Sequence, residues 1–227
     1  MFHGNFWSNV EMNLETGELE EYDSGIRRHE DLYRRTDPDW RHENLKDDLA
    51  LQLYLLKRGK LATVEWQPLK RLAAALETDF NPDAERIAEE AGKLLDSYAY
   101  ATVRCILAKI ENFAEANGKQ LMVLFLDPSG AMDQLLRGET RPDQEIVDYL
   151  KANQFRYFDM NEVHAAEYRS FNLDVPAYYK RYFIGHYNQT GTHFLPTRWL
   201  LRWSSGWSPN RLPTGRFQSN RLTSKTT

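Results

Sequence analysis

The sequence has a single cysteine and no long apolar run, and these two shortages exclude several classes of protein. Cys105 is the only cysteine among 227 residues, so an intrachain disulfide is impossible, and its place within an apolar helical pattern favours a buried thiol over redox chemistry. The longest apolar run, residues 121–126, is far shorter than the roughly 20 residues that a membrane-spanning helix needs. Residues 1–10 show no basic-then-apolar signal pattern. We therefore expect neither membrane insertion nor export, which would leave the chain as it stands in the cytoplasm.

Acidic residues are absent from the end of the chain. Asp174 is the last of the 33 acidic residues, whereas eight of the 29 basic residues follow it. Residues 198–227 also hold three of the six tryptophans and five arginines, a mixture that can bind nucleic acid by phosphate pairing and base stacking. Neither a basic helix nor a stacking sheet is indicated there, so we expect no nucleic-acid partner and a basic, irregular tail over residues 196–227. An out-of-frame stretch would also explain this composition.

The bulk composition is that of a folded protein. Apolar residues make up 41% and charged residues 27% of the sequence, far from the composition of disordered chains. A chain of this length can bury roughly 70% of its unfolded surface. We therefore expect one domain over residues 1–195, followed by the tail.

Several segments show hairpin or helical patterns before the first predicted core strand. Residues 10–22 alternate apolar and polar side chains around Gly17, which is typical of a hairpin. The leucines of residues 45–57 recur at helical spacing, and Gly59 supplies a stop. A long helical region follows Pro82. One face of that region is predicted to carry six apolar side chains: Tyr98, Val103, Ile106, Leu107, Ile110 and Phe113.

Two apolar strands with a helix between them indicate the fold class. Residues 121–126 form a continuous apolar run that ends at Asp127, the pattern of a parallel strand covered by helices on both faces. Residues 142–151 predict an amphipathic helix, and residues 155–158 predict a second strand that ends at Asp159. This order predicts an α/β protein, a three-layer α/β/α sandwich with a mainly parallel sheet. Ligands bind outside the carboxyl ends of such strands, so residues 127–132 and residues 159–164 are candidate rims of a site.

The strongest motif lies after these strands. Residues 185–194 read Gly-His-Tyr-Asn-Gln-Thr-Gly-Thr-His-Phe, with the spacing His186-x-Asn188-x-x-Gly191. This pattern resembles the final conserved block of the SGNH (GDSL-type) hydrolases. The resemblance covers about residues 4–195 and implies a sandwich of the SGNH or flavodoxin-like kind, without its first strand. It also implies that His186 is a general base and that Asn188 shapes the loop at the substrate.

The role implied for His186 is chemically reasonable. An imidazole has an unperturbed pKa near 6.5 and takes a proton from a hydroxyl near neutral pH. The alternative is a helix N-terminus that Asn188 or Thr190 caps, with His186 and His193 as incidental polar residues. The two histidines are seven residues apart without a nearby cysteine or an established carboxylate partner, so we expect no metal site and no cofactor.

A second, shorter similarity lies at the start of the chain. Residues 4–9, Gly-Asn-Phe-Trp-Ser-Asn, are similar to the Gly-x-Asn-Asp block of the same family and its variants. The similarity implies that Asn5 donates a hydrogen bond to the oxyanion and that Gly4 lies beside the substrate. Such a donor contributes roughly 3 kcal/mol to acyl transfer. A turn asparagine next to a glycine is the alternative interpretation.

The nucleophile and the orienting acid of the family have no counterpart in their usual places. The family carries its serine in a Gly-Asp-Ser motif upstream of the asparagine block, but only four residues precede Asn5. Ser24 follows a charged hairpin and Ser97 lies in a helical pattern, so neither has the strand-to-turn context of a nucleophile. The family's acid lies two or three residues before the histidine, where this chain has apolar residues. Asp159 is the remaining candidate for that role.

The resemblance implies a truncated or degenerate SGNH-type serine esterase domain, since members of that family act on acyl esters, often of carbohydrates. A small-molecule or carbohydrate ester is therefore the expected substrate. We expect little or no activity from the chain alone, because losing the nucleophile of a serine hydrolase costs on the order of 10⁶ in turnover. The alternative is a non-catalytic α/β ligand-binding or scaffold domain, whose crevice holds a ligand without chemistry.

Overall fold

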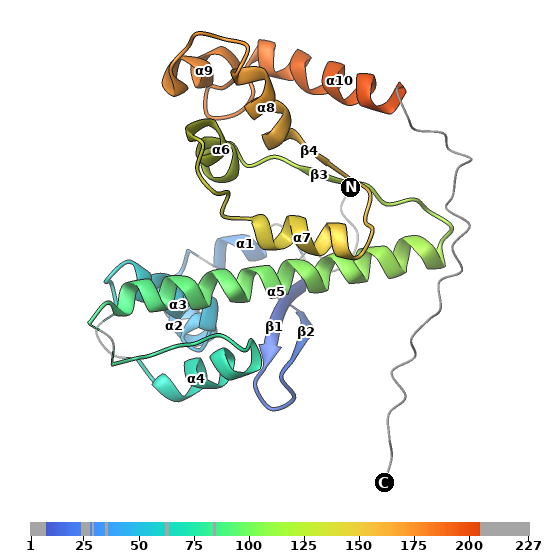
Figure 1. The fold of residues 1–227 in the computed structure, drawn as a ribbon. Helices are drawn as coiled ribbons and strands as arrows, with labels where there is room; N and C mark the ends of the chain where they lie inside the picture. Colours follow the sequence, from blue (N-terminus) through green and yellow to red (C-terminus); the bar gives the residue numbers. More distant parts are fainter. Residues whose placement is uncertain are drawn as a thin grey trace. The chain divides into compact units, whose positions relative to one another are not determined.

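The computed structural model describes residues 8–23, 28, 30–34, 36–61, 64–83 and 85–204. The described chain is mixed α/β and mostly helical (Figure 1). It divides into two compact units. Unit 1 comprises Met1–Met122 and Asp143–Arg156, and unit 2 comprises Val123–Pro142 and Tyr157–Thr227. The domain boundary predicted between residues 195 and 196 stays a prediction.

Unit 1 begins with the hairpin that the alternating pattern predicts. Strands β1 (Ser8–Asn13) and β2 (Glu18–Asp23) pair antiparallel. The Asn13 side chain accepts hydrogen bonds from the backbone N–H groups of Glu15 and Thr16 within the turn. Gly17 closes the turn with a φ of 72°, a left-handed conformation that glycine adopts without steric cost. The hairpin prediction is therefore confirmed.

The helices of unit 1 follow the hairpin. They are α1 (Asp31–Arg34), α2 (Pro38–Leu45), α3 (Leu49–Lys57), α4 (Trp66–Ala75), α5 (Ile87–Ala116) and α7 (Gln144–Ala152). The helix predicted over residues 45–57 begins only at Leu49, because the Asp48 side chain caps it by accepting from the Leu51 N–H at 2.9 Å. Leu45 ends the preceding helix instead.

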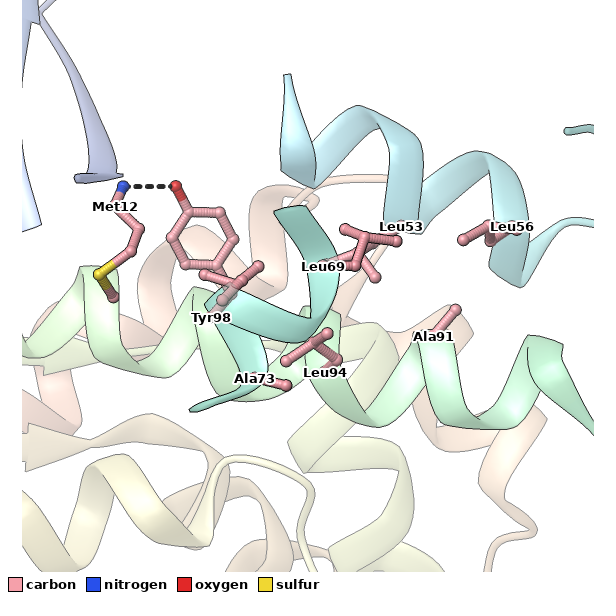
Figure 2. Packing of buried hydrophobic residues seen from close by; sticks show 9 residues of the cluster. Met12, Leu53, Leu56, Leu69, Ala73, Ala91, Leu94 and Tyr98 are labelled. Carbon is pink, nitrogen blue, oxygen red and sulfur yellow. Dashed lines mark hydrogen bonds between the residues drawn. The ribbon is translucent and has the colours of Figure 1, made fainter. Parts of the chain in front are cut away.

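The core of unit 1 lies where α3, α4 and α5 meet. Leu53 of α3, Leu69 of α4 and Leu94 of α5 are fully buried against one another (Figure 2). Each such side chain contributes roughly 2 kcal/mol of hydrophobic free energy. The Met12 N–H of β1 donates to the Tyr98 hydroxyl at 3.0 Å and so joins the hairpin to α5.

The apolar face predicted along α5 is only partly buried. Tyr98 and Leu107 are buried, but Val103, Ile106, Ile110 and Phe113 are exposed, Phe113 by 66%. Periodicity shows that side chains share one face of a helix, but whether another element covers that face depends on the tertiary structure. The helix itself is confirmed, and four of the six apolar side chains on the predicted face are exposed.

Unit 2 contains the only parallel strands in the described residues. β3 (Val123–Phe125) pairs in parallel with β4 (Tyr157–Asp159), so that Val123 lies opposite Tyr157. The helices of the unit are η1 (Pro128–Met132), α6 (Asp133–Arg137), α8 (Met160–Tyr168), α9 (Val175–Tyr182) and α10 (Gln189–Ser204). The two predicted strands and their parallel direction are confirmed, although each strand is shorter than expected.

The α/β class is confirmed, but the described residues show no clear three-layer sandwich. Their two sheets have two strands each. A strand covered on both faces would bury successive side chains, yet Leu124 of β3 is 47% exposed. The apolar run that suggested a central strand therefore lies in a small sheet with an uncovered face.

The end of the described chain is helical where an irregular tail was expected. Helix α10 continues through Pro196 to Ser204. A proline in a helix interior removes one backbone hydrogen bond, but contacts around it support this helix. Arg198 pairs with Glu167 of α8, and its guanidinium lies 5.2 Å from the centre of the Phe194 ring. The expectation is wrong for residues 196–204, and residues 205–227 lie outside the described part. No described helix is long and apolar enough to cross a bilayer.

Candidate functional site

His186 lies at the tip of a short turn between α9 and α10. Phe183 and Tyr187 form an antiparallel bridge, and the Ile184 N–H donates to the His186 carbonyl at 2.7 Å. Gly185 has a φ of 92°, which glycine permits and other residues resist. The turn leaves the His186 side chain exposed to solvent.

Asn188 and Gly191 hold this turn in place. The Asn188 amide donates to the Arg181 carbonyl at the end of α9, and its oxygen accepts from the Gly191 N–H at the start of α10, both at 3.0 Å. A Cβ at Gly191 would overlap the Tyr182 carbonyl oxygen and the Tyr187 ring. The spacing His-x-Asn-x-x-Gly therefore has a structural cause: the asparagine joins two helix ends, and the glycine allows their close approach. These contacts fit the alternative interpretation, a helix N-terminus that Asn188 caps.

The hydrogen bond of the His186 ring determines which nitrogen is basic. Nδ1 lies 2.8 Å from the Tyr187 carbonyl oxygen. A carbonyl oxygen only accepts, so Nδ1 carries the proton and donates it. The unprotonated nitrogen is then Nε2, for which the described residues supply no partner. This tautomer is the one that a general base requires.

His164 of α8 is a second, buried histidine that fixes the position of Tyr187. Its Nε2 lies 2.7 Å from the Tyr187 hydroxyl, and its Nδ1 lies 2.9 Å from the Tyr178 hydroxyl. Because the Tyr178 hydroxyl also donates to the His164 carbonyl at 3.1 Å, we assign the Nδ1 proton to His164 and make Nε2 the acceptor from Tyr187. Tyr187 thus links the two histidines, through its hydroxyl to His164 and through its carbonyl to His186.

The surroundings of His164 keep it neutral. Its side chain is fully buried, and the rings of Tyr182, Phe183 and Phe194 lie around it with centroid distances of 4.8 to 5.5 Å. Burial in this aromatic cluster lowers the pKa of His164 from 6.5 to about 4. The sequence places His164 at the end of the candidate rim of residues 159–164 but predicts no role for its side chain. The one available signal was the density of aromatic residues in residues 178–194, which predicts a cluster but does not say which polar side chain lies inside it.

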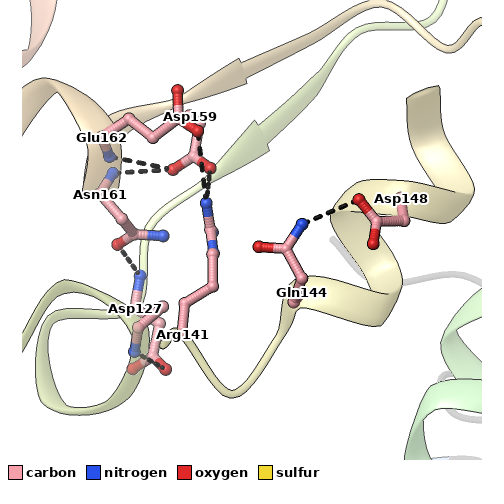
Figure 3. Close-up of polar contacts among 8 residues, drawn as sticks. Asp127, Arg141, Gln144, Asp148, Asp159, Asn161 and Glu162 are labelled. Carbon is pink, nitrogen blue, oxygen red and sulfur yellow. Dashed lines mark hydrogen bonds and ion pairs between the residues drawn. The ribbon is translucent and has the colours of Figure 1, made fainter. Parts of the chain in front are cut away.

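Asp159, the candidate orienting acid, has other partners in the structure. It is buried, forms an ion pair with Arg141, and caps α8 by accepting from the N–H groups of Asn161 and Glu162 (Figure 3). The Arg141 side chain is itself only 4% exposed. Arg141, Asn161 and Glu162 are the described partners of the Asp159 carboxylate, and none of them is a histidine. The orienting role of Asp159 stays a prediction that these contacts do not support.

Asp127 plays a comparable part at the end of β3. Its carboxylate accepts from the N–H groups of Gly130 and Ala131, both at 3.0 Å, and its own N–H donates to the Asn161 side chain at 2.8 Å. The carboxyl ends of both parallel strands are therefore closed by caps and cross-links (Figure 3). The role of these residues as the rim of a site stays a prediction, because the contacts show only that they cap helices and cross-link the strand ends.

The remaining candidates are located as follows. Gly4 and Asn5, the expected oxyanion block, lie outside the described residues, as does Ser24. Ser97 lies in the middle of α5, as expected, and not in the sharp turn of a nucleophile. Within the part of the chain that the structure describes, no three histidine, cysteine or acidic side chains cluster as metal ligands.

Comparisons with known proteins identify no relative. No family model, no curated protein and no solved structure matches the chain.

Proposed function

We propose that this chain is a degenerate SGNH-type hydrolase domain that retains the general base of an acyl-ester hydrolase, His186, without an effective serine nucleophile. The observation that carries the proposal is the hydrogen bond from His186 Nδ1 to the Tyr187 carbonyl. It leaves Nε2 as a free base on an exposed turn. The motif spacing that suggested the family supports the same reading, since Asn188 and Gly191 hold that turn.

The chemistry available to His186 is proton transfer to its Nε2. With an ester nearby, Nε2 takes a proton from a water molecule as the water adds to the carbonyl carbon and the carbonyl π electrons move to the oxygen. The Tyr187 carbonyl stabilises the imidazolium through Nδ1, the task that a carboxylate performs in a serine triad. The imidazolium then returns the proton to the alcohol oxygen as the ester C–O bond breaks, which releases an alcohol and a carboxylic acid. We propose this carbonyl for the orienting role in place of Asp159. A small-molecule or carbohydrate ester remains the proposed substrate.

The larger parallel sheet belongs to the same proposal. β3 and β4 already pair in parallel, and the exposed side chains of Met122 and Leu124 offer apolar surface that a fuller sandwich would cover. We therefore propose that the complete fold is a sandwich of the SGNH or flavodoxin-like kind, in which further parallel strands lie beside β3 and β4.

Hydrolysis of p-nitrophenyl acetate by the full chain tests the base. We expect slow turnover without labelling of a serine by a fluorophosphonate, and we expect His186→Ala to lower the rate to that of the buffer. His193→Ala is the matched control, because His193 is an exposed histidine of the neighbouring helix. A rate unchanged in His186→Ala would refute the role of the base, and stoichiometric fluorophosphonate labelling would show that the domain is not degenerate.

The second candidate is a non-catalytic ligand-binding or scaffold domain. The caps formed by Asp127 and Asp159 favour it, because carboxylates engaged with backbone N–H groups and Arg141 are not free for chemistry. On this reading His186→Ala leaves the affinity for a ligand nearly unchanged, and ester turnover is absent from the unmodified chain as well.

A further inference from the structure

Unit 1 contains a hollow that the proposed hydrolase chemistry does not use. It lies between β1, the residues that lead into α3 and those that lead into α4, and Tyr98 of α5 closes one side. Its volume is about 740 Å³, within the range of sites that hold small organic molecules. The described residues that line it all belong to unit 1.

The inner wall of the hollow is apolar. Leu14, Leu49, Leu61 and Val64 line it and are each partly buried. These side chains also pack against the leucine core of the unit, so the wall belongs to the folded body of unit 1. A ligand with a hydrocarbon or aromatic body would gain roughly 25 cal/mol for each Å² of apolar surface that it buries there.

The rim of the hollow is negatively charged. The exposed carboxylates of Glu11, Asp47 and Glu65 line it, and none of the three forms an ion pair with a described residue. Lys46 is the only basic residue among the described lining residues. Asp48 also lines the hollow, although its carboxylate caps α3. The rim therefore presents an excess of carboxylates without cationic partners.

Two polar side chains in the wall each have a hydrogen-bonding position that no described residue fills. Gln52 donates through its amide nitrogen to the Lys46 carbonyl at 2.8 Å, but its Oε1 is buried without a hydrogen-bond partner among the described residues. The Tyr98 hydroxyl accepts from the Met12 N–H, and its own proton has no acceptor among the described residues. A buried acceptor without a donor is costly, but Gln52 Oε1 has too little accessible surface for a ligand in the hollow to reach it.

Burial raises the pKa of the Tyr98 hydroxyl in the wall of the hollow, and the negative charges of Glu11 and Asp48 at the rim raise it further. The same field favours a positive group in the hollow and opposes a negative one. A carboxylate, a phosphate or the anionic form of an acyl compound is therefore a poor fit.

We propose that this hollow is a binding site for a small organic cation, a primary ammonium compound with an apolar body. The ammonium group lies among the carboxylates of Glu11, Asp47 and Glu65, and the apolar body covers the leucine wall. The site is independent of His186 and of the proposed hydrolase function.

Titration of the full chain with 2-phenylethylammonium tests the site. Two matched probes accompany it: 2-phenylethanol has nearly the same shape without charge, and 3-phenylpropanoate carries the opposite charge. Binding is followed by two-dimensional NMR of backbone amides. We expect saturable shifts at residues 46–52 and 61–68 with the ammonium compound, weaker binding at higher salt, much weaker binding of the alcohol, and no shifts with the carboxylate.

Charge substitutions locate the contact. Asp47→Asn combined with Glu65→Gln should weaken ammonium binding roughly threefold to tenfold, because each exposed charge pair contributes modestly. Glu18→Gln is the matched control, since Glu18 is an exposed carboxylate at the far end of the hairpin that does not line the hollow. Thermal unfolding verifies that the variants are folded. The proposal is overturned if the alcohol binds as tightly as the ammonium compound, if no saturable shifts occur, or if the double variant binds like the unmodified chain.

Discussion

The Tyr187 hydroxyl donates to Nε2 of the buried His164 at 2.7 Å, and through this bond the core of unit 2 determines where the His186 turn lies. The same tyrosine accepts from His186 through its carbonyl. Tyr187 therefore holds the exposed ring of His186 in a fixed position relative to the aromatic core around His164. Three predictions follow from the contacts of unit 2.

The first prediction concerns stability against pH. Burial lowers the pKa of His164 in the folded chain to about 4, whereas the unfolded chain has the ordinary value of 6.5. Between these values the unfolded state binds more protons, so the contribution of His164 is complete above pH 6.5 and is lost as the pH falls towards 4. The loss amounts to about 3 kcal/mol. Urea unfolding from pH 4 to 7 should show this slope, and His164→Phe should remove it.

His193→Gln serves as the control for this series, because His193 is exposed and its removal should leave the slope unchanged. A slope of the same size in His164→Phe and in the unmodified chain would contradict the assignment and would place the pH dependence in the carboxylates.

The second prediction concerns the link between the histidines. Tyr187→Phe keeps a ring that stacks on Phe183, whose centroid is 4.6 Å away, but removes the hydroxyl. His164 Nε2 then lacks a donor, which should lower the free energy of unfolding by about 1–3 kcal/mol. The Tyr187 carbonyl should also be held less firmly, so that the share of His186 with its proton on Nδ1 falls. Nitrogen-15 NMR of the ring nitrogens measures this share.

Tyr33→Phe is the matched control, because Tyr33 is 71% exposed and lies outside unit 2. Unchanged ring-nitrogen shifts of His186 in Tyr187→Phe, together with an unchanged free energy of unfolding, would show that the Tyr187 hydroxyl does not position the His186 turn.

The third prediction concerns the buried ion pair. Arg141→Met leaves the Asp159 carboxylate buried without its cation, which should cost about 3–5 kcal/mol of unfolding free energy. Arg137→Met is the control: Arg137 pairs with Asp133 at 2.8 Å, but its side chain is 49% exposed, so its loss should cost less than about 1 kcal/mol. Equal losses of unfolding free energy in the two variants would show that burial does not strengthen the contribution of the Arg141–Asp159 pair to stability.

Much of the local structure was predictable from the sequence, because its causes are local. Gly17 and Gly59 mark their turns, since both need a positive φ. The apolar runs around Leu124 and Phe158 identify two strands, and their parallel direction follows from the helix between them. The spacing of Asn188 and Gly191 likewise indicates a locked turn, because both act within a few residues of His186.

The tertiary structure alone decided which of these features are buried and which polar groups meet. Asp159 at a strand end can cap, pair or orient a histidine, and only the buried position of Arg141 selects the first two. Val103 and Phe113 recur at the spacing of a core face, yet both are exposed, because that spacing does not determine whether another element covers the face.

His164 is the clearest case. One histidine in an amphipathic helix is ordinary in a sequence, and it becomes the centre of unit 2 because Tyr178 and Tyr187, 14 and 23 residues further on, close around it. Sequence patterns by themselves determined the hairpin, the two parallel strands and several of the helices, because these depend on neighbours along the chain. Burial, protonation state and hydrogen-bond partners depend on residues distant in sequence, and these only the tertiary structure brings together.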